Sequence, residues 1–529
     1  MPTQIGVNRN HKNDRERTKE ADGKKKYMFF HINKPAKETV INFLIILSIN
    51  AILSTAVFWL PLDQDNFAFL YAGKGLLQGK GIFADFADNK GPLIYCWYSL
   101  LYFLFKERYR LILFISHLII DTLAIFLAST FGEKILSDGK PKNLLKNYIF
   151  ILLILTIVLY KSASLGPPLA GFYPEQIEIL LLLTGFHKLI KYKKRSWFTA
   201  GICFALAILS RQTAVFFSPV VLYLFADKYL KKKTTFSHLG NILLGGMVVF
   251  ATLAAIAIYA KNFKAMIDNM ITFNLTYGQS IDIYKKLPSL LHWSASTFVV
   301  STVLLMLKDF WNWKDENKYL FRILSISGLL SIFVGGIVYH HHFLQLAIFL
   351  IPVALAYYSK VSPKCLLPTD IATLLFLLSS CVTFTAYNIK TAKQDSCQKE
   401  ATAVIKNAVK ATDSTYIQVV PYYPEYYLRT GYNSPDRYYQ QFFVLSYYNK
   451  ENTRYVEEHK KLSGNKKLDE TLFVTVSKNS FDKQMIKEYI QNFGSAFDLK
   501  NYKEEDTLEN CDIEIKFFQV EVQKGMSPL

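Results

Sequence analysis

Long apolar runs alternate with short polar segments between residues 40 and 388 of the chain. Most of these runs are about 17 to 25 residues long, which is the length of helix that crosses the core of a bilayer. Beyond residue 390 the pattern changes, because the tail is polar, rich in lysine and tyrosine, and without a long apolar run. The pattern predicts an α-helical multi-spanning membrane domain over 39–390 and a soluble domain over 391–529.

The composition and charge agree with this division. Of 529 residues, 51% are hydrophobic and only 19% are charged, whereas soluble proteins carry about 25% charged residues. The net charge of +19 would suit a nucleic-acid partner, but the basic residues form short clusters between the apolar runs. Such clusters are the positive-inside signal that orients spans, so nucleic acid is not an expected partner. Residues 1–38 lack a signal-peptide core and are expected to form a basic cytoplasmic tail.

The apolar run 91–105 decides the predicted topology. It is short for a straight crossing, which needs about 20 residues. If it crossed, the basic clusters near 134–146, 188–195 and 228–233 would all face outward, against the positive-inside rule. We therefore predict that 91–105 lies in the outer interface, that about 11 spans cross the membrane, and that the tail is outside. The predicted spans lie near 39–60, 109–132, 147–164, 176–190, 196–210, 212–227, 238–260, 289–308, 319–338, 343–359 and 366–388.

The residues from 61 to 108 then form one long external loop. Asp63 and Asp65 lie just past the end of the first span, where acidic groups are costly unless they face a polar cavity. The following stretch has apolar residues at helical spacing, which predicts a second surface helix. A solvated loop start, or a helix N-cap at Asp65, would also explain the acidic residues.

The order of residues in this loop resembles the first external loop of the GT-C glycosyltransferase superfamily. The likeness is greatest to bacterial transferases of the protein mannosyltransferase and aminoarabinose transferase type, with the loop form D-E-x-x-x-A-Y…G…Y-x-D-x-x-D-x-K-P-P-L. The matching residues are Asp65, Ala68, Phe69, Gly79, Phe83, Asp85, Asp88, Lys90, Pro92 and Leu93. Asn66 stands where that pattern has Glu, and Gly91 stands where it has the first Pro.

Three later residues match the family at lower specificity. Glu175 follows Pro174 in the second external loop, Arg211 lies at the outer end of a helical hairpin, and His341 falls in a segment similar to H-Y-F-L-Q-x-x-P. Glu175 could instead offset the charge of a helix N-terminus, and Arg211 could be an interfacial arginine. Three consecutive histidines cannot share one helical face, so a three-histidine metal site is not expected.

The resemblance implies a transferase that moves a sugar from a polyprenyl-phosphate donor to a glycolipid, polysaccharide or protein acceptor. The reaction would take place on the outer face of a bacterial plasma membrane and would invert the anomeric carbon. The implied roles are general base for Asp65, further catalytic carboxylates for Asp63 and Glu175, donor phosphate binding for Lys90, Arg211 and His341, and a loop acidic pair for Asp85 and Asp88. A divalent metal, Mg²⁺ or Mn²⁺, could bridge Asp65 and Glu175. The sugar, the acceptor and the metal requirement stay open.

The tail is predicted to be a small α/β domain. Strands are expected at 414–420, 471–477 and 511–522, with a short helix or turn at 421–431. Two further helices are expected near 450–463 and 483–494. If the tail is outside the cell, its two cysteines, Cys397 and Cys511, are expected to form a disulfide.

Two other classes of membrane protein compete with a sugar transferase. Transporters and lipid flippases often contain inverted repeats and broken helices near the midplane, and no repeat relates the halves of this sequence. Polysaccharide ligases and polymerases usually carry their large external loop late in the chain, whereas here it follows the first span. Both alternatives remain open on the sequence alone.

Overall fold

The protein is described from a computed structural model of residues 1–529. The structure describes residues 34–58, 62–86, 88, 90–136, 171–191, 193–272, 318–333, 340–342, 344–345, 348–349, 352, 396–420, 423–434, 471–477, 486–487, 498–508 and 513–521. The predicted spans near 147–164, 289–308 and 366–388, and the predicted helix near 450–463, lie outside these residues. The chain divides into two units, Met1–Ile45 and Ile46–Leu529, and every contact described below lies within the second.

The apolar part of the chain is helical. Its helices are α2 (Lys34–Ser54), η2 (Thr55–Phe58), α5 (Tyr109–Ser116), η3 (His117–Asp121), α6 (Thr122–Leu136), α8 (Pro174–Leu189), α9 (Lys194–Ser210), η4 (Gln212–Phe217), α10 (Ser218–Leu230), α11 (Phe236–Tyr259), α12 (Phe263–Ile267), η5 (Asp268–Thr272), α16 (Lys318–Phe333) and η6 (His340–His342). Among the described residues, three stretches are long and apolar enough to cross a membrane: Tyr109–Gly132, Gln212–Leu230 and Phe236–Tyr259. All three coincide with predicted spans.

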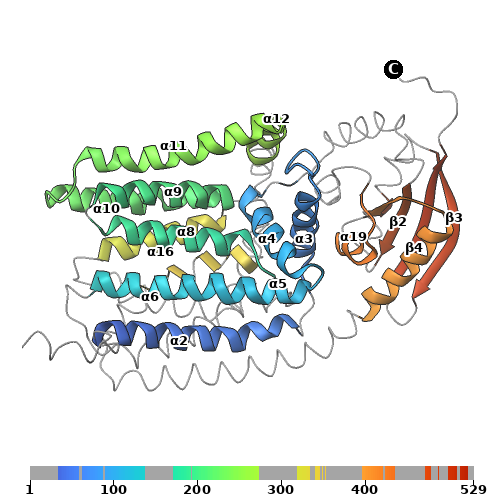
Figure 1. The fold of residues 1–529 in the computed structure, drawn as a ribbon, viewed down its shortest axis with the longest axis horizontal. Coiled ribbons are helices and arrows are strands. Elements are labelled where there is room, and N and C mark those ends of the chain that lie inside the picture. Colours follow the sequence, from blue (N-terminus) through green and yellow to red (C-terminus); the bar gives the residue numbers. More distant parts are fainter. Residues whose placement is uncertain are drawn as a thin grey trace, which may run out of the picture. The chain divides into compact units, whose positions relative to one another are not determined.

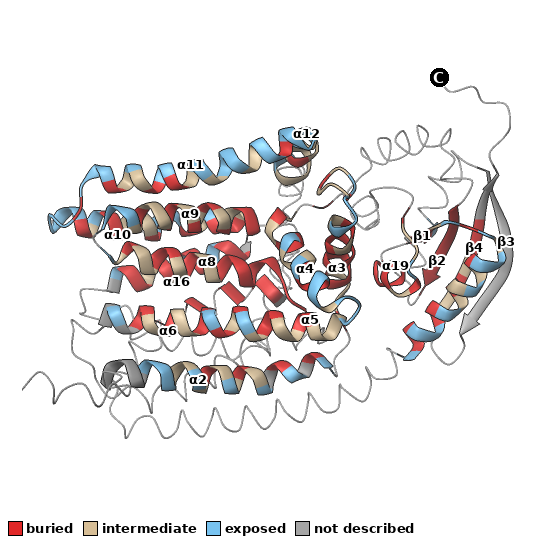
Figure 2. Cartoon of the chain, in the orientation of Figure 1, coloured by how far each residue is buried: buried red, intermediate tan, exposed pale blue. Residues whose placement is uncertain are grey.

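Helices α6, α8, α9 and α11 lie side by side with similar directions (Figure 1). Glycines allow α9 and α11 to touch through their backbones: a Cβ at Gly201 would lie 2.0 Å from the carbonyl oxygen of Ile242, and one at Gly245 would lie 2.2 Å from that of Phe198. Such close approach at small residues is typical of helices packed within membranes. Helix α8 is largely buried, whereas α11 exposes much of its surface (Figure 2).

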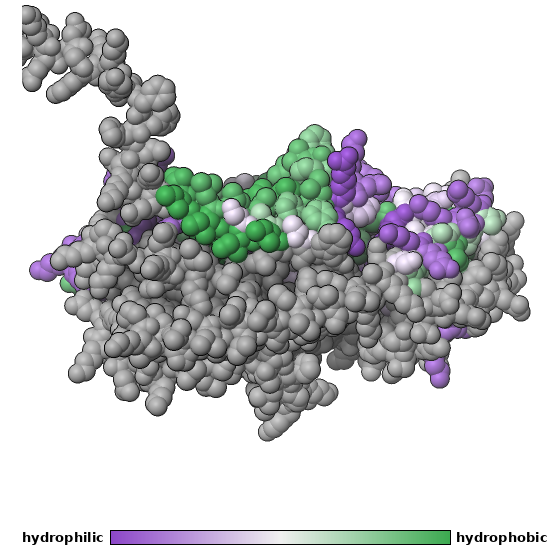
Figure 3. Space-filling model, turned by 90° about the horizontal axis from the view of Figure 1, so that it is seen from below, coloured by the Kyte–Doolittle hydropathy of each residue, from purple (hydrophilic) through white to green (hydrophobic). Residues whose placement is uncertain are grey.

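The exposed surface of the helical part is apolar. On α11 the exposed side chains include Leu243, Met247 and Ile258. On the face shown in Figure 3, hydrophobic residues gather in one area and hydrophilic residues border it. A large exposed apolar patch on a soluble protein would be a liability, but it is expected where helices meet lipid.

Two helices of the external loop have a different direction from the others. Helices α3 (Gln64–Leu77) and α4 (Pro92–Phe105) run at a steep angle to α8 and α9 (Figure 1); α4 contacts α5, α8 and α9, and α3 packs against α4. At 1.5 Å per residue, α4 is about 21 Å long, less than the core of a bilayer, which is about 30 Å. The helices cross closely at Gly73, where a Cβ would lie 2.8 Å from the backbone nitrogen of Ser99. The interfacial position of 91–105 stays a prediction.

The tail contains a four-stranded sheet in the order β1-β2-β4-β3. Its strands are β1 (Tyr416–Val420), β2 (Thr471–Ser477), β3 (Asp498–Leu508) and β4 (Ile513–Glu521). Strand β1 pairs parallel with β2, and the other two pairings are antiparallel. A helix over 396–411 precedes β1, and α19 (Glu425–Thr430) follows it. Three of the strands lie where the sequence predicted them; β3 and the helix over 396–411 were not predicted.

The structure describes one of the two cysteines in the tail. Cys397 is buried at the start of the helix over 396–411, and it is disulfide-bonded. Cys96 and Cys203 are free thiols. The predicted partner, Cys511, lies outside the described residues, so the pairing stays a prediction.

The tail shares a hydrophobic core with the external loop. Tyr71 of α3 packs on Tyr427 of α19, with ring centroids 5.2 Å apart, and its hydroxyl accepts a hydrogen bond from the Ser434 backbone at 2.9 Å. Gln64 donates to the buried Glu425 carboxylate at 2.9 Å. These contacts fix the first turn and the middle of α3 against α19.

Candidate functional site

The candidate site lies where the start of α3, the start of α8, the turn after α9 and η6 meet. Helix α8 begins at Pro174, whose fixed backbone angle favours the first helical position. Gln176 reinforces this start, because its Oε1 accepts a hydrogen bond from the Tyr173 backbone at 2.8 Å. Helix α9 ends at Ser210, and the chain then turns at Arg211. These helix ends deliver Glu175 and Arg211 to one place.

Glu175 is surrounded by positively charged or protonatable groups. The Arg211 guanidinium forms an ion pair with it. His341 Nε2 lies 3.5 Å from Glu175 Oε1, and His342 Nε2 lies 4.0 Å from it. Glu175 is only 2% exposed, and among the described residues its Oε2 has no hydrogen-bond partner. A buried carboxylate requires such partners, and here they come from two separate segments of the chain, the turn after α9 and η6.

Asp63 joins this group through Tyr173. The Tyr173 hydroxyl donates a hydrogen bond to Asp63 Oδ2 at 2.6 Å. The Tyr173 ring stacks on His341, with ring centroids 4.3 Å apart and planes 15° apart. Asp63 is the N-cap of α3, yet among the described contacts its side chain makes no capping hydrogen bond. Its carboxylate bonds to Tyr173 at the site, and backbone hydrogen bonds from Gln64 and Asp65 in the first turn of its own helix also lower its pKa.

Asp65 lies in the first turn of α3 and is not the N-cap. Its charge contributes, with that of Asp63, to raising the pKa of Tyr173. Asp65 thus lies near the site, although the short hydrogen bond to Tyr173 belongs to Asp63.

The electrostatics of Asp63 suit a base. Burial raises the pKa of this carboxyl above its ordinary value, while the hydrogen bond from Tyr173 and the charge of Lys90 act in the opposite direction. Burial and the nearby Asp63 charge raise the pKa of Tyr173 well above its usual range. Tyr173 therefore remains a hydrogen-bond donor. A carboxylate with a raised pKa is a stronger proton acceptor, which general base catalysis requires.

The predicted loop acidic pair separates into two different roles. Asp88 is buried, and its Oδ1 lies 3.7 Å from Lys90 Nζ and accepts a hydrogen bond from the Lys90 backbone at 3.3 Å. Asp85 is exposed and accepts from the Gly81 backbone at 2.6 Å, which closes a turn. Asp88 therefore holds Lys90, whereas Asp85 shapes the loop.

Gly91 explains one departure from the family pattern. A Cβ at this position would lie 1.6 Å from the carbonyl oxygen of Leu209. The loop therefore touches the backbone at the end of α9, immediately before Arg211. Any larger residue, proline included, would push Lys90 and Arg211 apart.

Asn66 explains the other departure. Its Oδ1 accepts hydrogen bonds from the Phe172 backbone at 2.7 Å and from the Tyr98 hydroxyl, and it is 0% exposed. Asn66 thus joins α3, α4 and the segment before α8. A glutamate would not reproduce these contacts, so this residue has a positioning role here.

Within the described part of the chain, one group of residues could hold a metal ion. The ligand atoms of Glu175, His341 and His342 lie within 4.8 Å of one another. Two imidazoles and a carboxylate suit zinc better than the Mg²⁺ or Mn²⁺ expected from the sequence, and Asp65 is not in the group. The Arg211 guanidinium already pairs with Glu175 Oε1. A metal would have to displace it.

Sequence reasoning missed Tyr173 and His342. Tyr173 lies 110 positions from Asp63, and the sequence shows no sign of that contact. His342 is buried beside His341, with the two rings 4.7 Å apart in an edge-to-face arrangement. A short 3-10 turn brings both histidines to Glu175, which a regular helix would not do.

Known proteins match this chain in structure but not in sequence. No protein-family model matches the sequence, and no curated protein matches it. The solved structure of ArnT from Cupriavidus metallidurans bound to undecaprenyl phosphate has a TM-score of 0.56 and 10% identity, covering 91% of this chain and 98% of that one. The apo structure has a TM-score of 0.55 and 10% identity, covering 92% and 98%. The chain therefore has a fold similar to that of ArnT.

Proposed function

We propose that the protein is a glycosyltransferase that moves a sugar from a polyprenyl-phosphate donor to an acceptor at the outer face of a bacterial plasma membrane. The observation that carries this proposal is the convergence of Asp63, Tyr173, Glu175, Arg211 and His341 where the apolar helices end. A base and an anion-binding group thus lie together at one end of a helical domain whose fold is that of ArnT.

The cations of the site suit a lipid phosphate. Arg211 presents a planar guanidinium that can bind two phosphate oxygens at once. His341 and His342 add ring nitrogens beside it, and Lys90 is close enough for its charge to lower the pKa of Asp63. The polyprenyl tail would lie against the apolar helix surfaces. Glu175 would orient these cations rather than take a proton, because its Oε1 faces Arg211 and both histidines.

The contacts favour Asp63 as the general base, in place of Asp65. Asp63 is held by Tyr173 at 2.6 Å, and burial raises its pKa. An acceptor hydroxyl beside Asp63 would lose its proton to the carboxylate while its oxygen bonds to the anomeric carbon. The bond from that carbon to the phosphate oxygen breaks, and polyprenyl phosphate leaves with the electron pair. One such displacement inverts the anomeric carbon.

The arrangement in the membrane is part of the proposal. The N-terminal residues 1–38 would lie in the cytoplasm, and the domain over 391–529 would lie outside. The reaction would take place at the external loop over 61–108, on the same side of the membrane as the domain over 391–529. Support comes from the orientation of α4 across the other helices and from the disulfide at Cys397.

The test measures release of undecaprenyl phosphate by purified protein in nanodiscs. The donors are undecaprenyl-phosphate hexoses and pentoses, and the acceptors are bacterial envelope lipid and glycan fractions. We expect Asp63→Asn to lower kcat by about 10² or more, because a positioned base contributes about 10² to 10⁴. Asp65→Asn should have a smaller effect. Asp85→Asn is the matched control in the same loop, because its side chain only closes an exposed turn.

Two results would contradict the proposal. A wild-type protein that releases no undecaprenyl phosphate from any donor is not this transferase. If Asp65→Asn abolishes release while Asp63→Asn does not, the assignment of the base is wrong.

A further inference from the structure

A buried polar cluster lies inside the helical domain, beside the site but outside it. Between α5 and α6 the chain forms one π-helical turn, η3, from His117 to Asp121. Turns of this kind are rare and frequently occur at functional sites. Its two ends face each other, since His117 Nδ1 lies 2.8 Å from Asp121 Oδ2.

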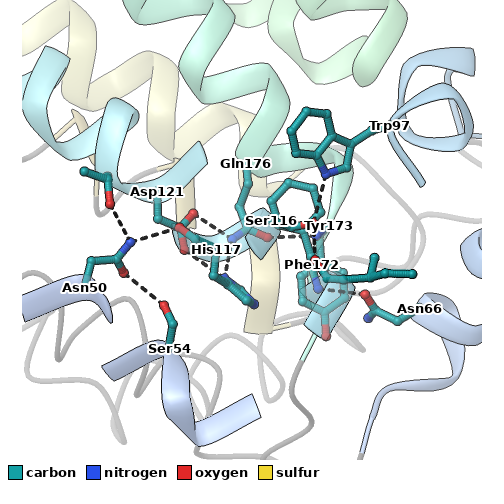
Figure 4. A network of polar contacts seen from close by, with 12 residues as sticks. Asn50, Ser54, Asn66, Trp97, Ser116, His117, Asp121, Phe172, Tyr173 and Gln176 are labelled. Carbon is teal, nitrogen blue, oxygen red and sulfur yellow. Dashed lines mark hydrogen bonds and ion pairs between the residues drawn. The ribbon is translucent and has the colours of Figure 1, made fainter. Parts of the chain in front are cut away.

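Gln176 connects this turn to the site (Figure 4). Its Nε2 donates to Asp121 Oδ1 at 2.8 Å and lies 3.1 Å from His117 Nδ1. Its Oε1 accepts from the Tyr173 backbone at 2.8 Å. Both ends of the Gln176 amide are thus engaged. Tyr173 in turn donates to Asp63.

Two other helices bond to the π-helical turn or to the residues next to it (Figure 4). Asn50 of α2 donates from Nδ2 to the His117 carbonyl and to Thr122 Oγ1, both at 2.9 Å. Trp97 of α4 donates to Ser116 Oγ at 2.9 Å. The turn is thereby fixed by two elements besides its own.

Apolar packing between the helices does not require polar residues at positions 117, 121 and 176. A polar side chain buried away from water costs free energy unless its hydrogen bonds are satisfied, and ionisable residues at membrane depth are functional candidates by default. Leucine or alanine at positions 117, 121 and 176 would pack the helices without that cost. What the polar residues add is a fixed orientation for the Tyr173 amide.

We propose that His117, Asp121 and Gln176 are positioning residues that hold Tyr173 against Asp63 from within the helical domain. The inference rests on the proposed function. Gln176 fixes the Tyr173 backbone, and the His117–Asp121 pair fixes Gln176. Tyr173 then keeps its hydroxyl on the Asp63 carboxylate and its ring on His341.

The position of Tyr173 has a measurable consequence for Asp63. The hydrogen bond from Tyr173 lowers the pKa of Asp63, against the larger effect of burial. The other groups whose charges act there are Lys90, which also lowers the pKa of Asp63, and Asp65 and Tyr98, which interact with the same cluster. Loosening Tyr173 should therefore raise the pKa of Asp63. The base would then be ionised only at higher pH.

The test compares Gln176→Met, Tyr173→Phe and the double variant in the release assay across pH. We expect Gln176→Met to lower kcat about tenfold or more, with little change in the donor KM, and to move the acidic limb of the kcat profile to higher pH. Tyr173→Phe should move it in the same direction. In the double variant, Gln176→Met should cause almost no further loss of kcat beyond that of Tyr173→Phe, because both changes act through the hydrogen bond from Tyr173 to Asp63. Asp121→Asn is a milder variant that should give a smaller shift of the same sign if Gln176→Met does not fold.

The matched control is Thr184→Val on the same helix, because Thr184 bonds only the Leu180 carbonyl one turn away among the described contacts. It should leave both kcat and the pH profile unchanged. The inference is overturned if Gln176→Met leaves the acidic limb in place, or if its effect on kcat persists in full in the Tyr173→Phe background.

A second readout needs no substrate. In thermal unfolding the losses from Gln176→Met and Tyr173→Phe should not add, because the first already releases the hydroxyl that the second removes. Additive losses would overturn the positioning role. If the wild-type protein has no transferase activity, only the proposed function is contradicted. The thermal unfolding of the variants would still show whether Gln176 positions Tyr173.

Discussion

Replacing Gly91 by alanine tests how closely the external loop must approach the end of α9. The new Cβ would lie 1.6 Å from the Leu209 carbonyl oxygen, 2.4 Å from its carbon and 3.0 Å from the Ser210 carbonyl oxygen. All three atoms are backbone, so no side chain can rotate away. Ordinary contact requires about 3.5 Å, so the loop and the end of α9 must separate by about 2 Å. That separation moves Lys90 away from Arg211.

The magnitude of two effects follows from this geometry. Overpacking of this kind costs about 1–3 kcal/mol of stability. A misplacement of about 1 Å can cost about 10²-fold in rate, so we expect the donor KM of Gly91→Ala to rise and its kcat/KM to fall by about 10² or more. The assays are thermal unfolding in detergent and the release of undecaprenyl phosphate from its sugar donors.

Gly240→Ala is the matched control for this prediction. It lies in α11 with nothing within 4 Å of the added Cβ. In a helix interior, alanine is favoured over glycine by about 1 kcal/mol, so this variant should be unchanged or slightly more stable. A Gly91→Ala protein with wild-type stability and wild-type KM would refute the described contact between the loop and α9.

Three further predictions concern the charges of the site. Glu175→Gln leaves the Arg211 guanidinium buried without its counter-charge, and we expect it to lower the free energy of unfolding by about 3 kcal/mol or more, measured by denaturation in detergent. Because the pKa of Asp63 is raised, the folded state loses stability as pH rises above 3.8, the ordinary pKa of the group. The Tm of the Asp63→Asn variant minus the Tm of the wild type should therefore increase with pH. A difference in Tm that does not change with pH would contradict the raised pKa. Treatment with a chelator should leave sugar transfer intact, because Arg211 already pairs with Glu175. If the chelator abolishes transfer and Zn²⁺ restores it, a metal ion takes the place of the Arg211 guanidinium.

Hydropathy and charge together predict much of the helical part. The stretches Tyr109–Gly132 and Phe236–Tyr259 are long, apolar and flanked by basic residues, so their positions follow from local sequence. The prediction that 91–105 does not cross the membrane came from charge rather than from hydropathy, because counting it as a span misplaces three basic clusters.

The tail shows why two elements were missed. Strand β3 is rich in charged residues and lies at the edge of the described sheet, where it pairs with β4, and charges at an edge prevent further pairing. The helix over 396–411 buries Ala401, Ile405 and Val409. Their spacing of four residues is a helical signal that was present in the sequence and was not used.

The residues of the candidate site also fall into two groups: those that the sequence singled out and those that only the structure shows. The sequence singled out Glu175, Arg211 and Lys90 because each matches a family motif at its own position, and their roles stay predictions. It did not single out Tyr173, Asn66 and Gln176, because their contacts join segments that are distant in the sequence. The proposal of Asp63 rather than Asp65 as the base also came from the structure, because Tyr173 donates its hydroxyl hydrogen bond to Asp63.

The binding of undecaprenyl phosphate, compared with that of undecaprenol, tests the central claim most directly, because it requires neither the sugar nor the acceptor. The two lipids share their tail and differ only in the phosphate that the cations should recognise. We predict that purified protein in nanodiscs binds the phosphate lipid at least tenfold more tightly, which corresponds to about 1.4 kcal/mol. Lys90→Met should weaken that preference, whereas Lys74→Met, in the last turn of α3, should not. Equal affinity for the two lipids, or a preference that survives in Lys90→Met, would contradict a phosphate site at Lys90.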